Sequence, residues 1–101
     1  MIKSFGNEIS RKIFEGEKLS GKELRTLGDL RIEKAQERFH VLNLACENDL
    51  LKLQSLHYHR LHGSKRYSID ANSRNSKWRI TFEWYNHEMR DVSLVRIEDT
   101  H

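Results

Sequence analysis

The sequence contains no proline, one cysteine, five glycines and no long run of apolar residues. No run approaches the roughly 20 apolar residues that a helix needs to cross a bilayer, so we expect no membrane-spanning segment. Because Cys46 has no second cysteine to pair with, an internal disulfide is excluded. Its place in an apolar helical pattern predicts a buried structural thiol, which fits a reducing, cytoplasmic setting. The opening residues have neither an apolar stretch nor a cleavage signature, so we expect no secretory signal.

The motifs of several enzyme classes are also missing. There is no glycine-rich phosphate loop, nucleophile elbow, metalloprotease helix or cysteine–histidine spacing typical of a zinc site. His57, His59 and His62 invite a metal interpretation, but no neighbouring carboxylate or cysteine completes a ligand set. We therefore expect neither a metal nor another cofactor.

Charge, by contrast, is abundant and unevenly distributed. The chain has 18 Lys or Arg against 15 Asp or Glu, a net charge of +3. Residues 1–50 balance nine Lys or Arg with nine Asp or Glu, whereas residues 52–80 hold seven cations against a single acid, Asp70. Such a patch concerns partners and association rates, not the fold. It indicates a surface for a polyanion, with RNA as the favoured candidate; the alternative is a solvated strand face.

The first half of the chain has helical patterns. Residues 1–5 alternate enough for a short strand, and Asn7 can cap a brief helix that Gly16 ends. Ser20-Gly21-Lys22-Glu23 is a capping box, after which apolar residues recur every three or four positions. This spacing predicts two helices, or one bent helix, over about residues 21–46.

Beyond residue 50 the apolar period changes to two. Three segments alternate apolar and polar side chains, the pattern of a strand with one buried face: residues 67–71, 78–85 and 92–98. The order β-α-α-β-β-β predicts an α+β fold in one domain over residues 1–101. Two to three helices would pack on one face of a small, mostly antiparallel sheet, and the other face would stay open for a ligand.

Short fragments spread over nearly the whole chain occur in an order typical of one family. They are Met1-Ile2-Lys3-Ser4-Phe5, Lys34-Ala35-Gln36, Leu42-Asn43, His59-Arg60-Leu61-His62-Gly63, Tyr67-Ser68-Ile69, Trp78-Arg79-Ile80-Thr81-Phe82 and Asp99-Thr100-His101. In these the chain resembles the HigB-like killer toxins of the RelE/ParE superfamily, the toxin halves of bacterial type II toxin–antitoxin pairs. The resemblance implies a RelE-like fold and a cytoplasmic, metal-independent endoribonuclease that cleaves mRNA in the ribosomal A site. It also implies a cognate helix-turn-helix antitoxin, with operator DNA reached only through the complex with that antitoxin.

Two features depart from the family pattern. The family usually ends in Asp-Tyr-His, whereas Thr100 stands in the middle position here, which removes an aromatic ring that could stack on a base. The loop over residues 72–77 is also about three residues longer than the family's loop, which would alter contacts with the ribosome or the substrate. Reduced activity is one expected consequence.

The chemistry that the resemblance implies assigns roles to particular residues. In metal-independent cleavage the ribose 2′-OH attacks the adjacent phosphate, which requires a base, an acid and cations for the charge on the phosphorane. Imidazole suits both proton transfers, because an unperturbed pKa of about 6.5 leaves both forms populated near neutrality. His59 and His101 are the acid–base candidates, and which of them is the acid stays open. Asp99 is a further candidate, as base or as the group that orients an imidazole.

Arg79 is the candidate for holding the scissile phosphate. It alternates with Trp78 and Ile80, so we expect it on the open face, where a guanidinium can bind phosphate bidentately. The alternative role is an exposed cross-strand partner of Glu83. The candidates for contacts with phosphate or ribosomal RNA are Arg60, His62, Lys65, Arg66, Lys77 and Thr100.

Two other functions stay open. One is a ParE-like toxin that poisons DNA gyrase by binding without chemistry, and the other is a catalytically weak nucleic-acid-binding relative. The set of His59, Asp99 and His101 favours the nuclease, whereas Thr100 keeps the weak relative in consideration. The nuclease hypothesis requires that folding bring His101 beside His59 and Arg79.

Overall fold

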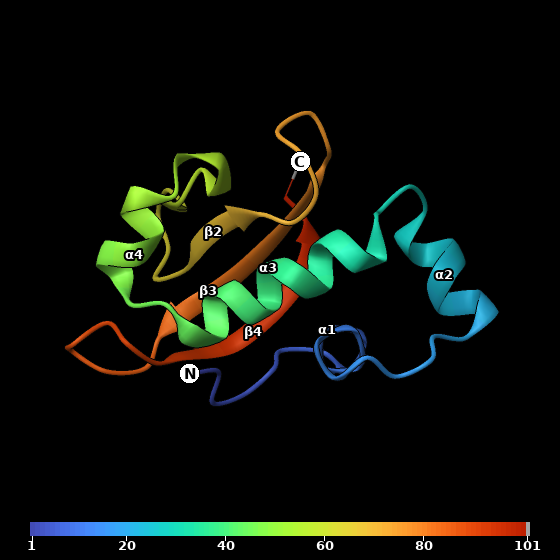
Figure 1. Ribbon diagram of the computed structural model, residues 1–101, viewed down its shortest axis with the longest axis horizontal. Helices are drawn as coiled ribbons and strands as arrows, with labels where there is room; N and C mark the ends of the chain where they lie inside the picture. The colour runs from blue at the N-terminus through green and yellow to red at the C-terminus, as the bar shows by residue number, and fades with distance from the viewer. Residues whose placement is uncertain (101) are drawn as a thin grey trace.

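Four strands form one antiparallel sheet in the computed structural model, which describes residues 1–100 (Figure 1). In chain order, which is also their order in the sheet, they are β1 (His59–Arg60), β2 (Tyr67–Asp70), β3 (Trp78–Trp84) and β4 (Val92–Asp99). The three strands predicted from alternation are present, each within one residue of its predicted end. The strand β1 was not predicted, because two exposed residues carry no alternating pattern.

The helices precede the sheet in the chain. They are α1 (Glu8–Glu15), α2 (Gly21–Leu27), α3 (Ile32–Leu44) and α4 (Glu47–Lys52), followed by the short 3₁₀ helix η1 (Gln54–Leu56). The predicted capping box starts α2: the Glu23 amide donates to Ser20 Oγ (3.1 Å) and the Ser20 amide to Glu23 Oε1 (2.9 Å). Gly16 ends α1 in the left-handed region, at φ 73°. The pattern over residues 21–46 therefore corresponds to two helices, α2 and α3.

The helix α4 was not predicted, and it changes the setting of the cysteine. Cys46 is the residue before α4, and its backbone N–H donates to Asp49 Oδ2 at 3.0 Å. The thiol is only half-buried, so the predicted fully buried thiol on a helical stripe is wrong. The physical reason is that α3 ends at Leu44, so the helical stripe does not extend to Cys46.

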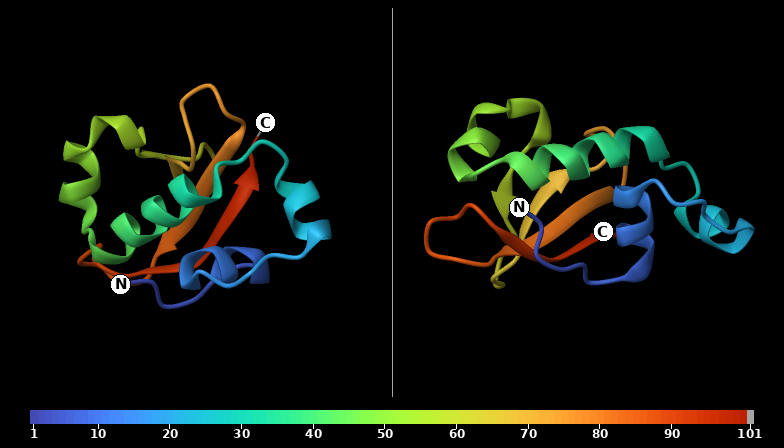
Figure 2. Two further views of the ribbon diagram at one scale, coloured as in Figure 1. Left: turned by 45° about the vertical axis from the view of Figure 1, so that its right-hand side comes forward. Right: turned by 60° about the horizontal axis from the view of Figure 1, so that its bottom comes forward.

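The core lies between α3 and one face of the sheet. Ala35, Phe39 and Leu42 of α3 are completely buried, as are Ile69 of β2 and Phe82 of β3. Figures 1 and 2 show α3 crossing this face, with α4 on the same side and α1 beside the edge of β4. The α+β class, the mostly antiparallel sheet and the packing of helices on one face are confirmed. No helix within residues 1–100 is long and apolar enough to cross a membrane.

The predicted first strand, residues 1–5, is reduced to two isolated parallel bridges, Ile2 with Val92 and Phe5 with Val95. Between the bridged residues of β4 lies Leu94, whose φ of 52° breaks the regular extended backbone. A continuous ladder cannot run past such an irregularity. The predicted order therefore lacks its first strand and gains β1, so all four strands follow the helices.

A buried serine attaches α1 to the outer edge of β4. The Ile97 amide donates to Ser10 Oγ at 2.8 Å, and Ser10 is fully buried. We expect Ser10→Ala to lower the free energy of unfolding by about 1–3 kcal/mol, because the amide loses its acceptor where water cannot replace it. Urea denaturation monitored by circular dichroism measures this loss.

Ser4 provides a matched control on the same strand edge. Its Oγ accepts from the Leu94 amide at 2.9 Å, but in an exposed setting. Water replaces this acceptor, so Ser4→Ala should change stability by less than about 0.5 kcal/mol. Equal losses for the two variants would contradict the role of burial at Ser10.

Candidate functional site

The face of the sheet opposite α3 carries polar side chains that strand register places in two rows. The first row crosses all four strands and consists of His59, Ser68, Thr81 and Arg96. The second row crosses β2, β3 and β4 and consists of Asp70, Arg79 and Glu98. We call these seven residues the polar face. The sequence predicted that this face would remain open, but Ser68, Asp70, Arg79 and Thr81 on it are buried, whereas His59 at the edge is exposed. His59 and Arg79 both belong to this face.

By standard strand spacings, the Cα atoms of His59 and Arg79 lie roughly 12 Å apart, across two strand intervals and two residues along β3. Folding therefore brings two of the predicted catalytic residues to one face from segments 20 positions apart in the sequence.

Arg79 is not free to hold a ligand, contrary to the expectation from the sequence. Its Nε lies 3.2 Å from Asp70 Oδ1, and the two side chains are 10% and 2% exposed. The Nη atoms donate to the backbone carbonyls of Ser76, Trp78 and Arg74, in the loop before β3 and at its start. The guanidinium therefore neutralises a buried carboxylate and holds the loop between β2 and β3.

Glu83 is not the partner of Arg79, because Arg79 pairs with Asp70 and the Glu83 carboxylate pairs with Arg66. Arg66 Nη1 is 3.6 Å from the Glu83 carboxylate. Arg66 Nη2 donates to Thr81 Oγ1 (2.7 Å) and to the Leu94 carbonyl (2.8 Å). Burial, and then the charge of Arg96, lower the pKa of Arg66, whose side chain is only 12% exposed. Arg66 is thus a mostly buried cation beside the first row, not a loosely solvated one.

Asp99 lies on the opposite face from His59 and Arg79. It pairs with Trp78, which belongs to the buried face of β3, and it follows the buried Ile97 by two residues. Asp99 is exposed there, at the end of β4. Strand alternation therefore directs Asp99 away from the polar face.

Thr100 follows β4 and is exposed. His101, the other predicted acid–base residue, lies outside the described residues, so its predicted position beside His59 is not tested.

The remaining predicted contacts lie at the two ends of the sheet. Arg60 pairs with Tyr67 on the helix side, and its Nε donates to the Ser64 carbonyl at 2.9 Å. His62 and Lys65 are exposed in the loop between β1 and β2. Lys77 is exposed in the loop before β3, with its Nζ 5.4 Å from the centre of the Trp78 indole ring. Exposed cations thus flank the polar face at both ends.

His59 is exposed, and its imidazole is oriented by the backbone. Its Nδ1 lies 2.9 Å from the carbonyl oxygen of His57. The two imidazole rings make an edge-on contact, with centres 5.5 Å apart. His59 therefore combines solvent access with a defined ring orientation, two properties that a proton-transfer group needs.

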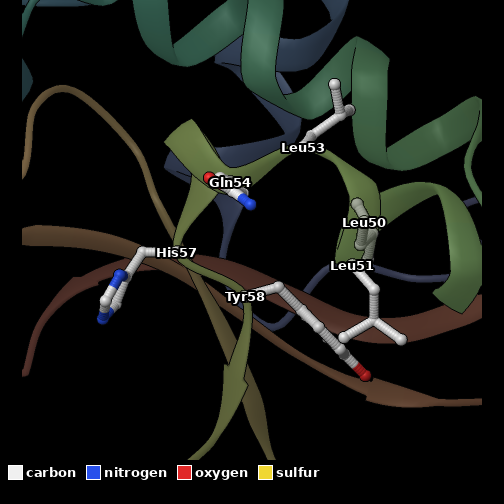
Figure 3. Close-up of a pocket in the computed structure, with 6 residues that line it drawn as sticks. All are labelled: Leu50, Leu51, Leu53, Gln54, His57 and Tyr58. Carbon is white, nitrogen blue, oxygen red and sulfur yellow. The ribbon is translucent and has the colours of Figure 1, made fainter.

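A hollow of about 240 Å³ lies beside this segment, on the side of α4 and η1 (Figure 3). It is lined by Leu50, Leu51, Leu53, Gln54, His57 and Tyr58. Its walls are mostly apolar, and Leu51 and Leu53 are well exposed. No pattern in the sequence indicated this hollow, because α4 and η1 were not predicted.

Tyr58 connects this segment to the sheet. Its hydroxyl donates to Glu47 Oε2 (2.6 Å) and accepts from Trp84 Nε1 (3.0 Å). Burial, and then the Glu47 carboxylate, raise the pKa of Tyr58 above its usual value. Because the folded protein holds this proton more tightly than the unfolded chain, the stabilisation is complete below about pH 10 and falls as the pH rises further.

We therefore expect Tyr58→Phe to reduce the loss of stability between about pH 8 and pH 11, because the variant has no phenol to keep neutral. Thermal unfolding monitored by circular dichroism at both pH values measures this difference. Tyr85→Phe, at a position that is 62% exposed, is the control for the loss of a tyrosine hydroxyl. A wild-type pH dependence retained in Tyr58→Phe would contradict the assignment.

The arrangement on the polar face suits binding of a polyanion and proton transfer at His59. Within the described chain, no three His, Cys, Asp or Glu side chains are grouped so that they could hold a metal ion. Comparisons of the chain with protein-family models, with curated proteins and with solved structures found no match.

Proposed function

We propose that this protein is the toxin of a type II toxin–antitoxin pair and an endoribonuclease that cleaves mRNA at the ribosome. The observation that carries the proposal is the exposed, oriented imidazole of His59 at the edge of the polar face, with exposed Lys65 and Lys77 at the two ends of the sheet. A nucleic-acid strand can lie along the exposed edge beside His59, and the exposed lysines supply phosphate contacts. The resemblance to HigB-like toxins supplies the ribosomal A site, the cytoplasmic setting and the helix-turn-helix antitoxin in this proposal.

In the proposed reaction the ribose 2′-OH loses its proton and its oxygen forms a bond to the adjacent phosphorus. The bond from phosphorus to the 5′-oxygen breaks, and that oxygen takes a proton from an acid. His59 is one proton-transfer group, and His101 is the other by resemblance. Arg96 is the arginine of the first row, its side chain is 41% exposed, and it offers charge to the phosphorane.

Induced expression in bacteria tests this function. We expect growth arrest and new RNA 5′-hydroxyl ends within open reading frames, because the proposed cleavage leaves the proton on the 5′-oxygen. The ends should disappear when translation initiation is blocked before induction, because the substrate is mRNA on the ribosome. Ends that persist without translation would indicate a free ribonuclease, and the absence of new ends would reject cleavage.

A binding toxin without chemistry is the second candidate. It is favoured by two observations: the guanidinium of Arg79 is already occupied, and Asp99 lies on the other face. This candidate predicts growth arrest with intact mRNA. For a ParE-like action on DNA gyrase, the arrest should be accompanied by gyrase-dependent DNA breaks, which a gel assay with purified gyrase detects.

A further inference from the structure

The backbone reverses at His57, directly before the edge strand β1. His57 ends η1 in the left-handed region, at φ 53° and ψ 46°, and its amide donates to the Gln54 carbonyl at 3.1 Å. Among residues 1–100, few non-glycine residues have a positive φ, and histidine is one of the residue types that tolerate it. Figure 3 shows the side chain of His57 directed away from that of Tyr58. In this conformation the carbonyl of His57 meets Nδ1 of His59, two residues later.

This contact determines which ring nitrogen carries the proton. A carbonyl oxygen can only accept a hydrogen bond, so Nδ1 of His59 must be the donor at 2.9 Å. In a neutral imidazole with its proton on Nδ1, the free lone pair is on Nε2. The contact thus favours the neutral form with the proton on Nδ1 over the form in which only Nε2 is protonated.

We infer that His57 is a positioning residue, whose left-handed backbone holds His59 with Nδ1 protonated and so makes Nε2 the base for the ribose 2′-OH. The role in catalysis rests on the proposed function, whereas the protonation state of the ring does not. The 2′-OH proton passes to Nε2 as the 2′-oxygen forms its bond to phosphorus. The bond from phosphorus to the 5′-oxygen breaks, and the 5′-oxygen takes a proton from a separate acid. His59 is then the base, and the acid must come from another residue.

Nitrogen NMR of the histidine rings tests the protonation state without any assay of activity. Long-range ¹H–¹⁵N correlations on the wild-type protein at alkaline pH should show a protonated Nδ1 and an unprotonated Nε2 for His59. His40 and His87, which are exposed elsewhere on the surface, serve as reference rings in the same spectrum. A wild-type spectrum with the proton of His59 on Nε2 would overturn the inference.

Two substitutions of His57 separate its backbone from its ring. Glycine enters the left-handed region without cost and keeps the carbonyl, so His57→Gly should preserve the ring state of His59. Valine is strongly disfavoured there, so His57→Val should move the proton of His59 toward Nε2. Retention of the Nδ1 proton in a folded His57→Val would contradict the inference. If His57→Val does not fold, the wild-type and His57→Gly spectra still decide the question.

RNA cleavage then tests the link to catalysis. We expect His57→Gly to cleave at close to the wild-type rate and His57→Val to lose roughly tenfold to a hundredfold in kcat, with little change in KM. A loss in His57→Gly as large as in His57→Val would assign the effect to the ring and not to the carbonyl. If the wild-type protein cleaves no RNA, the proposed function fails, while the NMR result still decides the orientation of His59.

Discussion

Replacing Arg79 with alanine is expected to lower the free energy of unfolding by about 3–5 kcal/mol, because it leaves a buried carboxylate without its principal cation. The Asp70 side chain is 2% exposed and receives Arg79 Nε at 3.2 Å. Arg74 also approaches Asp70, at 3.4 Å, but its side chain is 57% exposed and offers weaker compensation. The backbone carbonyls of Ser76 and Trp78 lose a donor in the same variant.

Chemical denaturation of Arg79→Ala, Asp70→Ala and the double variant measures this coupling. We expect the double variant to lose less stability than the sum of the two single losses, because each single change leaves the other charged group without its partner. Arg96→Ala is the matched control: its ion pair with Glu98, at 2.8 Å, is 41% and 35% exposed, so its loss should be about 0–1 kcal/mol. A similarly small loss for Arg79→Ala would contradict a buried structural pair.

This result bears on any activity measured for Arg79 variants. The sequence also predicts that loss of Arg79 reduces activity more than loss of Arg60 or Lys65 alone, and this stays a prediction. The contacts of Arg79 offer a different reason for such a loss of activity, because a destabilised protein loses activity in proportion to its unfolded fraction. Activity per folded molecule is therefore the quantity to compare among these variants.

Alternation predicted β2, β3 and β4 well because each has a buried face that an apolar period of two reveals. It failed for residues 1–5, where β4 accepts only two bridges on either side of the irregular Leu94. It also failed for β1, which owes its place to pairing with β2 and not to its own two residues. Such elements form by pairing with strands that lie elsewhere in the sequence, and a local pattern contains no information about that pairing.

The candidate site shows the same limit. The face of Arg79 followed from alternation, but its partner depended on the register between β2 and β3, which places Asp70 directly opposite. One signal was available: Asp70 is the only acid within residues 52–80, and a lone acid among cations is a natural partner for a buried arginine. The side of the strand on which Asp99 lies could also have been predicted, because Asp99 follows Ile97 by two residues and so shares its side.

The second large effect is expected for the chemistry. His59→Gln should lower kcat for RNA cleavage by about 10²–10⁴-fold, because glutamine keeps hydrogen-bonding capacity but cannot take up a proton at neutral pH. The change in KM should be small, since His59 is exposed at the edge of the sheet and other cations hold the phosphates. Single-turnover cleavage of mRNA on programmed ribosomes measures both quantities.

His40→Gln is the control, because His40 lies on α3, with its ring stacked on Phe14 at 4.6 Å between centres. This variant should cleave at the wild-type rate. Full toxicity and full cleavage by His59→Gln would remove His59 from the mechanism, and growth arrest without cleavage in the wild type would favour the binding toxin. Because His59 is exposed, we expect its substitution to leave the free energy of unfolding within about 0.5 kcal/mol of the wild type. A loss of cleavage at unchanged stability therefore separates a chemical role at His59 from the structural role that the contacts of Arg79 indicate.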